Sequence, residues 1–149
     1  RPMDHVGFLM SDNSRLLRRA FDRKVREIGV TGPQARLLLT LNRAPGENQG
    51  FYAERLEVEP ITLCRMADRL EEANMIERRP DPADRRAWQL HLTDKSRKMV
   101  GRLQQKAESL VDDMLAGLTA DERSEFSRLL TAVGENLSDL RDNARISHG

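Results

Sequence analysis

The sequence predicts a mainly α-helical domain that carries a small β-wing. Three observations predict it. Apolar residues recur at spacings of three and four along most of the 149 residues, which is the period of an amphipathic helix. Two segments near the middle alternate apolar and polar residues on either side of a tip rich in proline, aspartate and arginine, which indicates a hairpin. The length fits a single domain, residues 1–149.

The composition limits the classes of protein. Hydrophobic residues are 38% and charged residues 33%, so the core is lean and some apolar faces are expected to pair with a second subunit. A formal net charge of +1 excludes a uniformly basic nucleic-acid surface, so any basic patch is local. The single cysteine, Cys64, excludes an intrachain disulfide and fits a reducing compartment. With no long apolar run and no signal-peptide core, a cytoplasmic protein is expected.

The first half of the chain predicts two helices. The first covers about residues 7–29, with Leu17, Phe21 and Val25 on one face, and Gly29 ends it. Thr31 caps the second, which has Pro33 in its first turn and a strongly apolar sequence. The sequence Pro45-Gly46 stops this helix, which we expect to be central.

The middle of the chain predicts two short helices and a hairpin. The third helix covers about residues 49–57, and Pro60 opens the fourth, which runs to about residue 74. Its inward side chains are expected to be Ile61, Leu63, Met66, Ala67 and Leu70. Asn74 occupies the position of a left-handed C-cap. The strands are expected at 76–79 and 88–92, because two prolines should keep the tip, residues 80–86, out of either strand.

The last third predicts two long helices. Thr93 caps the fifth, and Thr119 with Glu122 forms a capping box for the sixth. The tail from residue 143 is expected to fray. Both helices carry heptad-like apolar stripes, which favour a further helix surface as partner, although packing within the chain is the alternative. The residues expected at a dimer interface are Val100, Leu103, Leu110, Phe126, Leu130, Val133 and Leu137.

Catalysis is not expected. His5, His91 and His148 are far apart in the sequence, and none pairs with another at metal-ligand spacing. Cys64 has no evident local base, and no glycine-rich phosphate loop is present. The sequence therefore predicts neither an enzyme, nor a metal site, nor a cofactor.

The central block predicts a winged helix-turn-helix DNA-binding lobe. Its second helix offers Thr62, Arg65 and Arg69 on a polar face, and the major groove admits one such helix. The arginine-rich hairpin suits the minor groove, where the negative potential is strongest. One alternative is an ordinary helical hairpin with a charged loop. Another is that Arg65 and Arg69 form salt bridges with neighbouring acids.

These residues resemble the MarR family of bacterial transcription regulators. The resemblance rests on the segments Asp68-Arg-Leu-Glu71, Met75-Ile76-Glu-Arg78, Asp81-Pro82-x-Asp84-Arg85-Arg86 and Leu90-His-Leu92-Thr93-Asp94. It implies a homodimer on an inverted-repeat operator in double-stranded DNA, with the winged helix-turn-helix at about 31–93 and dimerisation helices at about 7–29 and 94–142. The DNA contacts that we expect are Gln49, Pro60, Thr62, Arg65, Arg69, Arg78, Asp84, Arg85 and Arg86. Asn74 and Ser96 stand where glycine is common in the family.

The resemblance also implies a repressor that a small molecule releases. The candidate ligand-binding residues lie on the first helix and are Phe8, Met10, Ser11 and Arg15. An arginine beside apolar side chains suits the carboxylate of an aromatic acid, and the other arginines of this helix suit the phosphates of an acyl-CoA. Simple solvation of these arginines is the alternative. Control by oxidation of Cys64 is a weaker hypothesis, because burial would make the thiol inert. Rival functions are a helical protein-interaction module and a non-specific architectural DNA binder.

Overall fold

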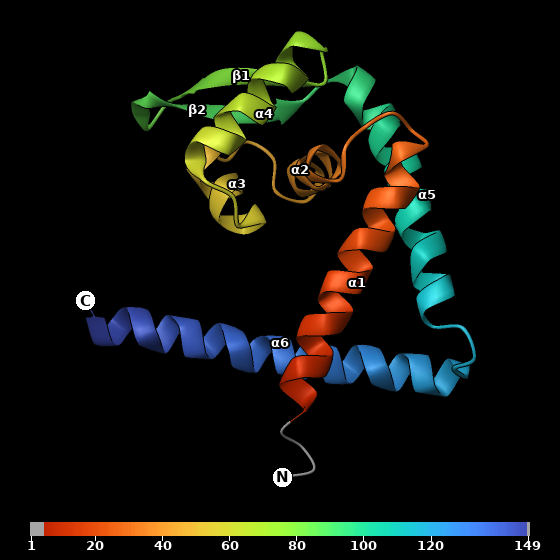
Figure 1. The fold of residues 1–149 in the computed structure, drawn as a ribbon. Coiled ribbons are helices and arrows are strands. Elements are labelled where there is room, and N and C mark those ends of the chain that lie inside the picture. Colours follow the sequence, from red (N-terminus) through yellow and green to blue (C-terminus); the bar gives the residue numbers. More distant parts are fainter. Residues whose placement is uncertain (1–4, 149) are drawn as a thin grey trace. The chain divides into compact units, whose positions relative to one another are not determined.

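The computed structural model describes residues 5–148, and side chains to residue 144. Figure 1 shows the order of the elements along the chain. The helices are α1 (Val6–Arg26), α2 (Gly32–Arg43), α3 (Gln49–Leu56), α4 (Pro60–Glu72), α5 (Asp94–Met114) and α6 (Ala120–His148), and the strands are β1 (Ile76–Asp81) and β2 (Asp84–Leu92). The chain forms two compact units, Arg1–Leu110 and Val111–Gly149. Within the described residues, no helix is both long and apolar enough to cross a membrane.

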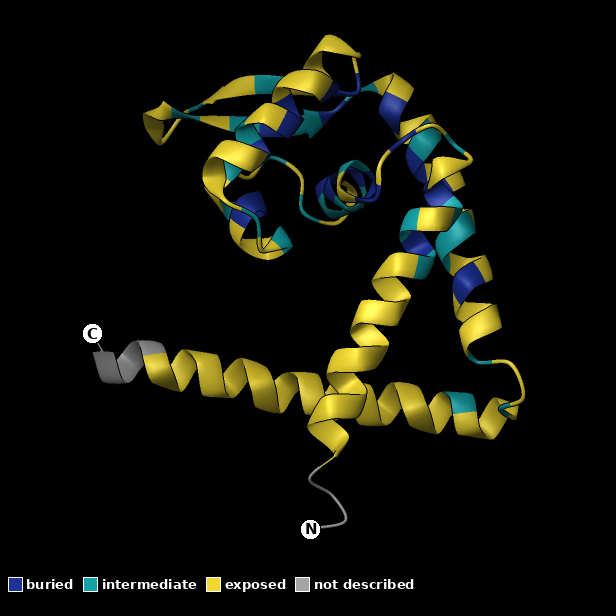
Figure 2. Cartoon of the chain, viewed as in Figure 1, coloured by how far each residue is buried: buried dark blue, intermediate teal, exposed yellow. Residues whose placement is uncertain are grey.

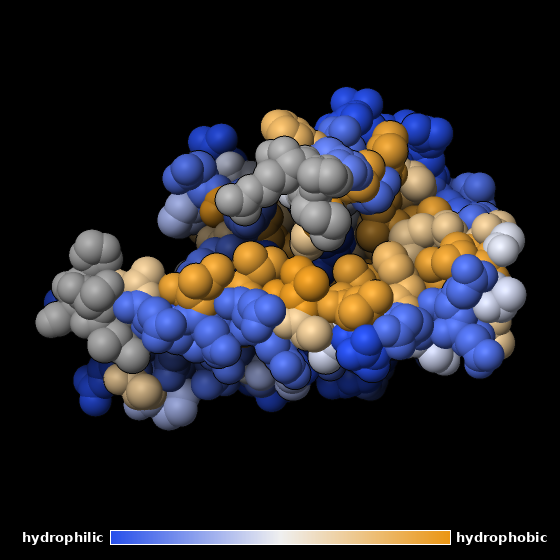
Figure 3. Space-filling view, turned by 90° about the horizontal axis from the view of Figure 1, so that it is seen from below, coloured by the Kyte–Doolittle hydropathy of each residue, from blue (hydrophilic) through white to orange (hydrophobic). Residues whose placement is uncertain are grey.

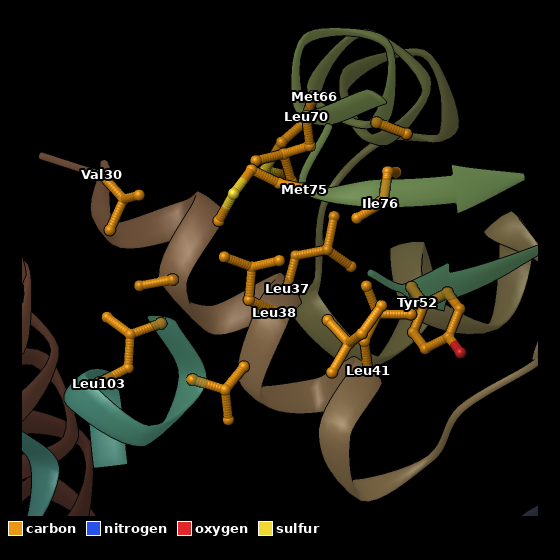
Figure 4. Close-up of a cluster of buried hydrophobic side chains, with 14 of the residues drawn as sticks. Val30, Leu37, Leu38, Leu41, Tyr52, Met66, Leu70, Met75, Ile76 and Leu103 are labelled. Carbon is orange, nitrogen blue, oxygen red and sulfur yellow. The ribbon is translucent and has the colours of Figure 1, made fainter. Parts of the chain in front are cut away.

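The core of the first unit surrounds α2, as the sequence predicts. Leu37, Leu38 and Leu41 are fully buried, and Figure 4 shows them between the strands on one side and Leu103 of α5 on the other. The neighbouring elements each contribute buried apolar side chains, which Figure 2 shows in dark blue. The hydrophobic effect of burying this cluster holds α1 to α5 and the hairpin together as one unit.

The predicted helix caps are confirmed. The Thr31 hydroxyl accepts from the Gln34 backbone N–H, and the Gln34 side chain returns the bond to Thr31, completing a capping box. Thr119 and Glu122 make the same reciprocal pair before α6. Asn74 has a φ of 57° after α4, a left-handed conformation that asparagine tolerates better than most residues.

The wing is longer than predicted. β1 and β2 pair antiparallel. Ile76 lies opposite Leu92 at one end and Pro80 lies opposite Trp88 near the other, with a register shift between Pro80 and Asp81. The prediction that residues 80–86 lie outside the strands is therefore wrong, because only Pro82 and Ala83 lie between β1 and β2. In the described two-stranded sheet β1 pairs only with β2, so the missing proline N–H can face away from the partner strand. A further isolated bridge joins Asn48, the residue before α3, to Gln89 of β2.

Helix α6 also extends beyond its prediction. It continues to His148, so the prediction that the chain frays from residue 143 is wrong. The physical reason is that no proline or glycine interrupts residues 143–148, and alanine and arginine in this segment favour the helix. The second unit therefore consists mainly of one long helix.

Candidate DNA-binding surface

Helix α4 has one buried and one exposed face. Leu63, Met66 and Leu70 belong to the core. Three of the predicted contact residues, Thr62, Arg65 and Arg69, are exposed on the opposite face together with Pro60. The exposed face thus presents two guanidinium groups and a hydroxyl, which are suitable donors to base edges and phosphates.

Ile61 does not point inward as predicted. It exposes 59% of its surface. At about 100° per residue, a position two residues before Leu63 lies on the opposite side of the helix from it. The inward prediction for Ile61 was therefore wrong, and the exposed face of α4 carries an isoleucine among its polar groups.

Arg78 joins the wing to the two helices of the helix-turn-helix. Its Nη2 lies 2.7 Å from Asp68 Oδ1, and its Nη1 lies 3.1 Å from Glu71 Oε1. Its Nε and Nη2 donate to Gln49 Oε1 at 3.2 and 3.0 Å, and Nη2 also donates to the Cys64 carbonyl at 3.3 Å. Burial opposes the charge on Arg78, but these acidic partners outweigh it and raise the pKa of the guanidinium.

This network changes the interpretation of two predicted DNA contacts. The structure brings Gln49 and Arg78 together, although they are 29 residues apart in sequence. Only 13% of the Arg78 side chain is exposed, so its donors serve the protein. We therefore describe Arg78 as a positioning residue that fixes β1 against α3 and α4. The sequence pattern does not indicate this role, because the acidic partners lie on a different element.

The wing tip presents the other predicted arginines. Arg85 and Arg86 are exposed at the start of β2. Asp84 Oδ1 accepts a hydrogen bond from the backbone N–H of Arg86 at 2.9 Å, so it orders the tip through the main chain. On β1, Arg79 pairs with Glu77 at 3.3 Å and lowers the pKa of that carboxyl.

A hollow of about 370 Å³ lies between the start of α2 and the exposed face of α4. Arg65 and Arg69 line it together with Thr31 and Gln34. The N-terminus of a helix and two guanidinium groups all favour a negative charge. Pro33, Val58 and Met66 also line the hollow, so it offers apolar surface beside these cationic groups. The residues of α2 are a part of this surface that the sequence did not indicate.

The remaining predicted residues lie elsewhere. Phe8, Met10, Ser11 and Arg15 are all exposed on α1, and Arg15 lies 3.8 Å from Asp12. Cys64 is half-buried on α4. Among the residues that the structure describes, no cluster of histidine, cysteine and acidic side chains is arranged to hold a metal ion.

The predicted dimerisation residues divide into two groups. Val100, Leu103 and Leu110 are buried within this chain, with exposed fractions of 3%, 0% and 8%. These three residues pack within the chain, which is the alternative given for the heptad-like stripes. Too little of each side chain is exposed to reach a second subunit. The α6 residues, by contrast, are exposed: Phe126, Leu130, Val133 and Leu137.

An exposed helix that follows a short helix, and a β-wing that follows the exposed helix, define a winged helix-turn-helix protein. Residues 30–88 match the family model described as MarR family. This segment is therefore a MarR family domain, and the fold class predicted from the sequence is confirmed. Members of this family are DNA-binding transcription regulators and not enzymes.

Solved structures agree over most of the chain. The apo form of MarR from E. coli is 26% identical, covers 85% of this chain and 94% of its own, and has a TM-score of 0.78. A cysteine-to-serine variant of the same protein complexed with operator DNA is 25% identical, covers 89% and 95%, and has a TM-score of 0.72. A MarR transcriptional regulator from Methanosarcina mazei shares the fold, with 23% identity, coverage of 92% and 99%, and a TM-score of 0.82.

Proposed function

We propose that this chain is a homodimeric transcription repressor that binds a pseudo-palindromic operator in the cytoplasm and leaves it when a small molecule binds. The observation that carries the proposal is the exposed face of α4, which presents Thr62, Arg65 and Arg69 on a MarR-type fold. A relative with that fold has been crystallised with operator DNA. The wing supplies a second cationic element in Arg85 and Arg86.

The two pairs of arginines have different tasks in this proposal. Arg65 and Arg69 enter the major groove, where a guanidinium can donate two hydrogen bonds to O6 and N7 of guanine. Arg85 and Arg86 approach the minor groove, where they respond to its width and potential. Loss of a base contact should cost about 1–3 kcal/mol and relax specificity at one position. Loss of a wing arginine should weaken binding more evenly.

The apolar face of α6 supports a dimer of this chain. Phe126, Leu130, Val133 and Leu137 recur at spacings of four, three and four and expose between 37% and 54% of their surfaces. Figure 3 shows hydrophobic side chains gathered in a row along this helix. Such a stripe needs an apolar partner, and a second copy would supply an identical one. Two recognition helices about 34 Å apart would then match one turn of DNA.

The effector proposed here is an aromatic acid or its acyl-CoA thioester. Support comes from Phe8 and Met10, which offer exposed apolar surface on the same helix, α1, as Arg15. A ligand can release DNA only if it binds the released conformation more tightly than the DNA-bound one. A rise in melting temperature with benzoate-type acids that Arg15→Ala abolishes would support this assignment. An unchanged melting temperature with both classes would contradict it.

The experiment that tests the proposal is selection of bound duplexes from a random-sequence library at near-physiological salt. One recovered inverted repeat, with half-sites about one helical turn apart, would support a dimeric specific regulator. Binding without a motif, lost steeply as salt rises, would indicate an architectural binder that contacts only phosphates. No binding at all would favour the helical protein-interaction module.

A further inference from the structure

The arginine contacts proposed above leave one side chain of α4 without a role. Ile61 exposes 59% of its surface, whereas Leu63, Met66 and Leu70 of the same helix are buried. A β-branched residue is also a weaker helix former than a straight-chain one. Neither core packing nor helix stability therefore accounts for isoleucine at this position.

The position of Ile61 places it beside the proposed base contacts. It is the second residue of α4, directly after Pro60. Arg65 and Arg69 follow it at intervals of four residues, so the three side chains lie along one face of the helix. Recognition helices contact base edges mainly through their N-terminal residues. If α4 enters the major groove with its arginine face, Ile61 enters with it.

The major groove offers an apolar side chain one specific partner. Each base pair presents donors and acceptors there, but only thymine presents a methyl group, at C5. We propose that Ile61 contacts the C5 methyl of a thymine in each half-site and thereby selects thymine over cytosine at that position. This inference rests on the proposed function, in which α4 is the recognition helix.

The spacing along α4 predicts where that thymine lies. Ile61 and Arg65 are separated by about 6 Å along the helix axis, which spans roughly two base-pair steps of DNA when the helix lies along the groove. The selected thymine should therefore lie about two base pairs from the guanine that Arg65 contacts. A guanine and a thymine at this spacing should appear in both half-sites of the recovered repeat.

Replacement of thymine by deoxyuridine tests the contact, since uracil pairs like thymine but lacks the methyl. The probe is the inverted repeat recovered by selection, with each symmetry-related thymine pair replaced in turn. At one of these thymine pairs, the replacement should lower the affinity of the wild-type protein about fourfold for each half-site. This is the loss expected for one buried methyl group. Ile61→Ala should bind thymine DNA with a similar loss and show no further loss on the uracil duplex.

Three variants make the test specific. Ile61→Val keeps a branched side chain and should retain most of the sensitivity to uracil. Glu72→Gln, at the exposed last residue of the same helix, should retain all of it. Because Ile61 is exposed, Ile61→Ala should keep the wild-type melting temperature and oligomeric state, so that its loss of affinity is not a loss of folding.

The outcomes separate this inference from the function on which it rests. An inverted repeat whose affinity is indifferent to uracil at every position would overturn the thymine contact and leave the regulator intact. Sensitivity that persists unchanged in Ile61→Ala would assign the methyl contact to another residue and also overturn it. Failure to recover any repeat would overturn both the proposed function and the inference.

Discussion

At the scale of single residues, Arg78 shows that the guanidinium of a basic side chain beside the recognition helix can be engaged by contacts within the protein. Its hydrogen bonds go to α3, to α4 and to a main-chain carbonyl. Arg79, the next residue, is half exposed and pairs within its own strand. The two neighbouring arginines thus have different roles, one holding the wing in place and the other lying at its surface.

Replacement of Arg78 by alanine should lower the free energy of unfolding by about 1–2 kcal/mol, because several charged hydrogen bonds are lost while the acidic partners stay hydrated. Urea denaturation measures this change. Arg79→Ala is the matched control and should change stability by less than about 0.5 kcal/mol. If Arg78→Ala kept full stability but lost operator binding, Arg78 would be a DNA contact and not a positioning residue.

His91 on β2 gives the wing a dependence on pH. Burial and the nearby Arg79 lower the pKa of its imidazole, and Glu77 opposes this only in part. A histidine with a lowered pKa in the folded state destabilises the fold once the pH falls below its unfolded pKa of about 6.5, because the unfolded chain then binds the proton more readily.

The melting temperature should therefore fall between pH 7.5 and 5.5, and less so in His91→Gln, whose side chain does not titrate. The carboxyls of Glu27 and Glu77 have lowered pKa values, so they stay ionised over this range and do not contribute. Equal losses in wild type and variant would show that His91 is not responsible.

At the scale of elements, the first turn of α2 is fixed against α1 by a close approach. A Cβ at Gly32 would lie 1.9 Å from Asp22 Oδ1, and Asp22 in turn pairs with Arg36 at 2.6 Å. An alanine at Gly32 can fit only if the carboxylate moves away from this guanidinium. A side chain at Gly32 would therefore compete with the Asp22–Arg36 pair for the space between α1 and α2.

Gly32→Ala should therefore destabilise the protein by about 1–3 kcal/mol in urea denaturation, as overpacked sites do. Gly101→Ala is the control, because a Cβ at Gly101 in α5 meets nothing within 4 Å. It should stabilise the helix by about 0.5–1 kcal/mol. A Gly32→Ala variant as stable as wild type would show that the Asp22 carboxylate moves aside without loss of stability.

The helices and strands differ in how far the sequence alone predicts them. The caps at Thr31, Asn74 and Thr119 could be predicted because each depends on a side chain and the backbone a few residues away. The inclusion of Pro80 in β1 could not be predicted, because a proline fits a strand only where its missing N–H faces an unpaired edge. The apolar stripe of α5 predicts that its residues are buried. It does not predict whether they are buried within one chain or between two chains.

At the scale of the whole molecule, α6 determines the proposed dimer. Leu137→Glu should dissociate the dimer at micromolar concentration and abolish high-affinity binding to the inverted repeat, since a carboxylate would be buried in an apolar contact. Light scattering with size-exclusion chromatography measures the mass. Ser138→Glu places the same charge one residue away, off the apolar stripe, and should leave the dimer intact. A dimer that survives Leu137→Glu would show that α6 is not the interface.

The position of Trp88 has a practical consequence for all of these measurements. It is the only tryptophan of the chain, it is 46% exposed, and it lies opposite Pro80 on the wing. Tryptophan fluorescence depends on the water around the indole ring, and the tryptophan emission of the unlabelled protein comes from the hairpin alone. Each titration with DNA or with a candidate effector can therefore be followed by an intrinsic optical probe located in the element that is expected to meet the minor groove.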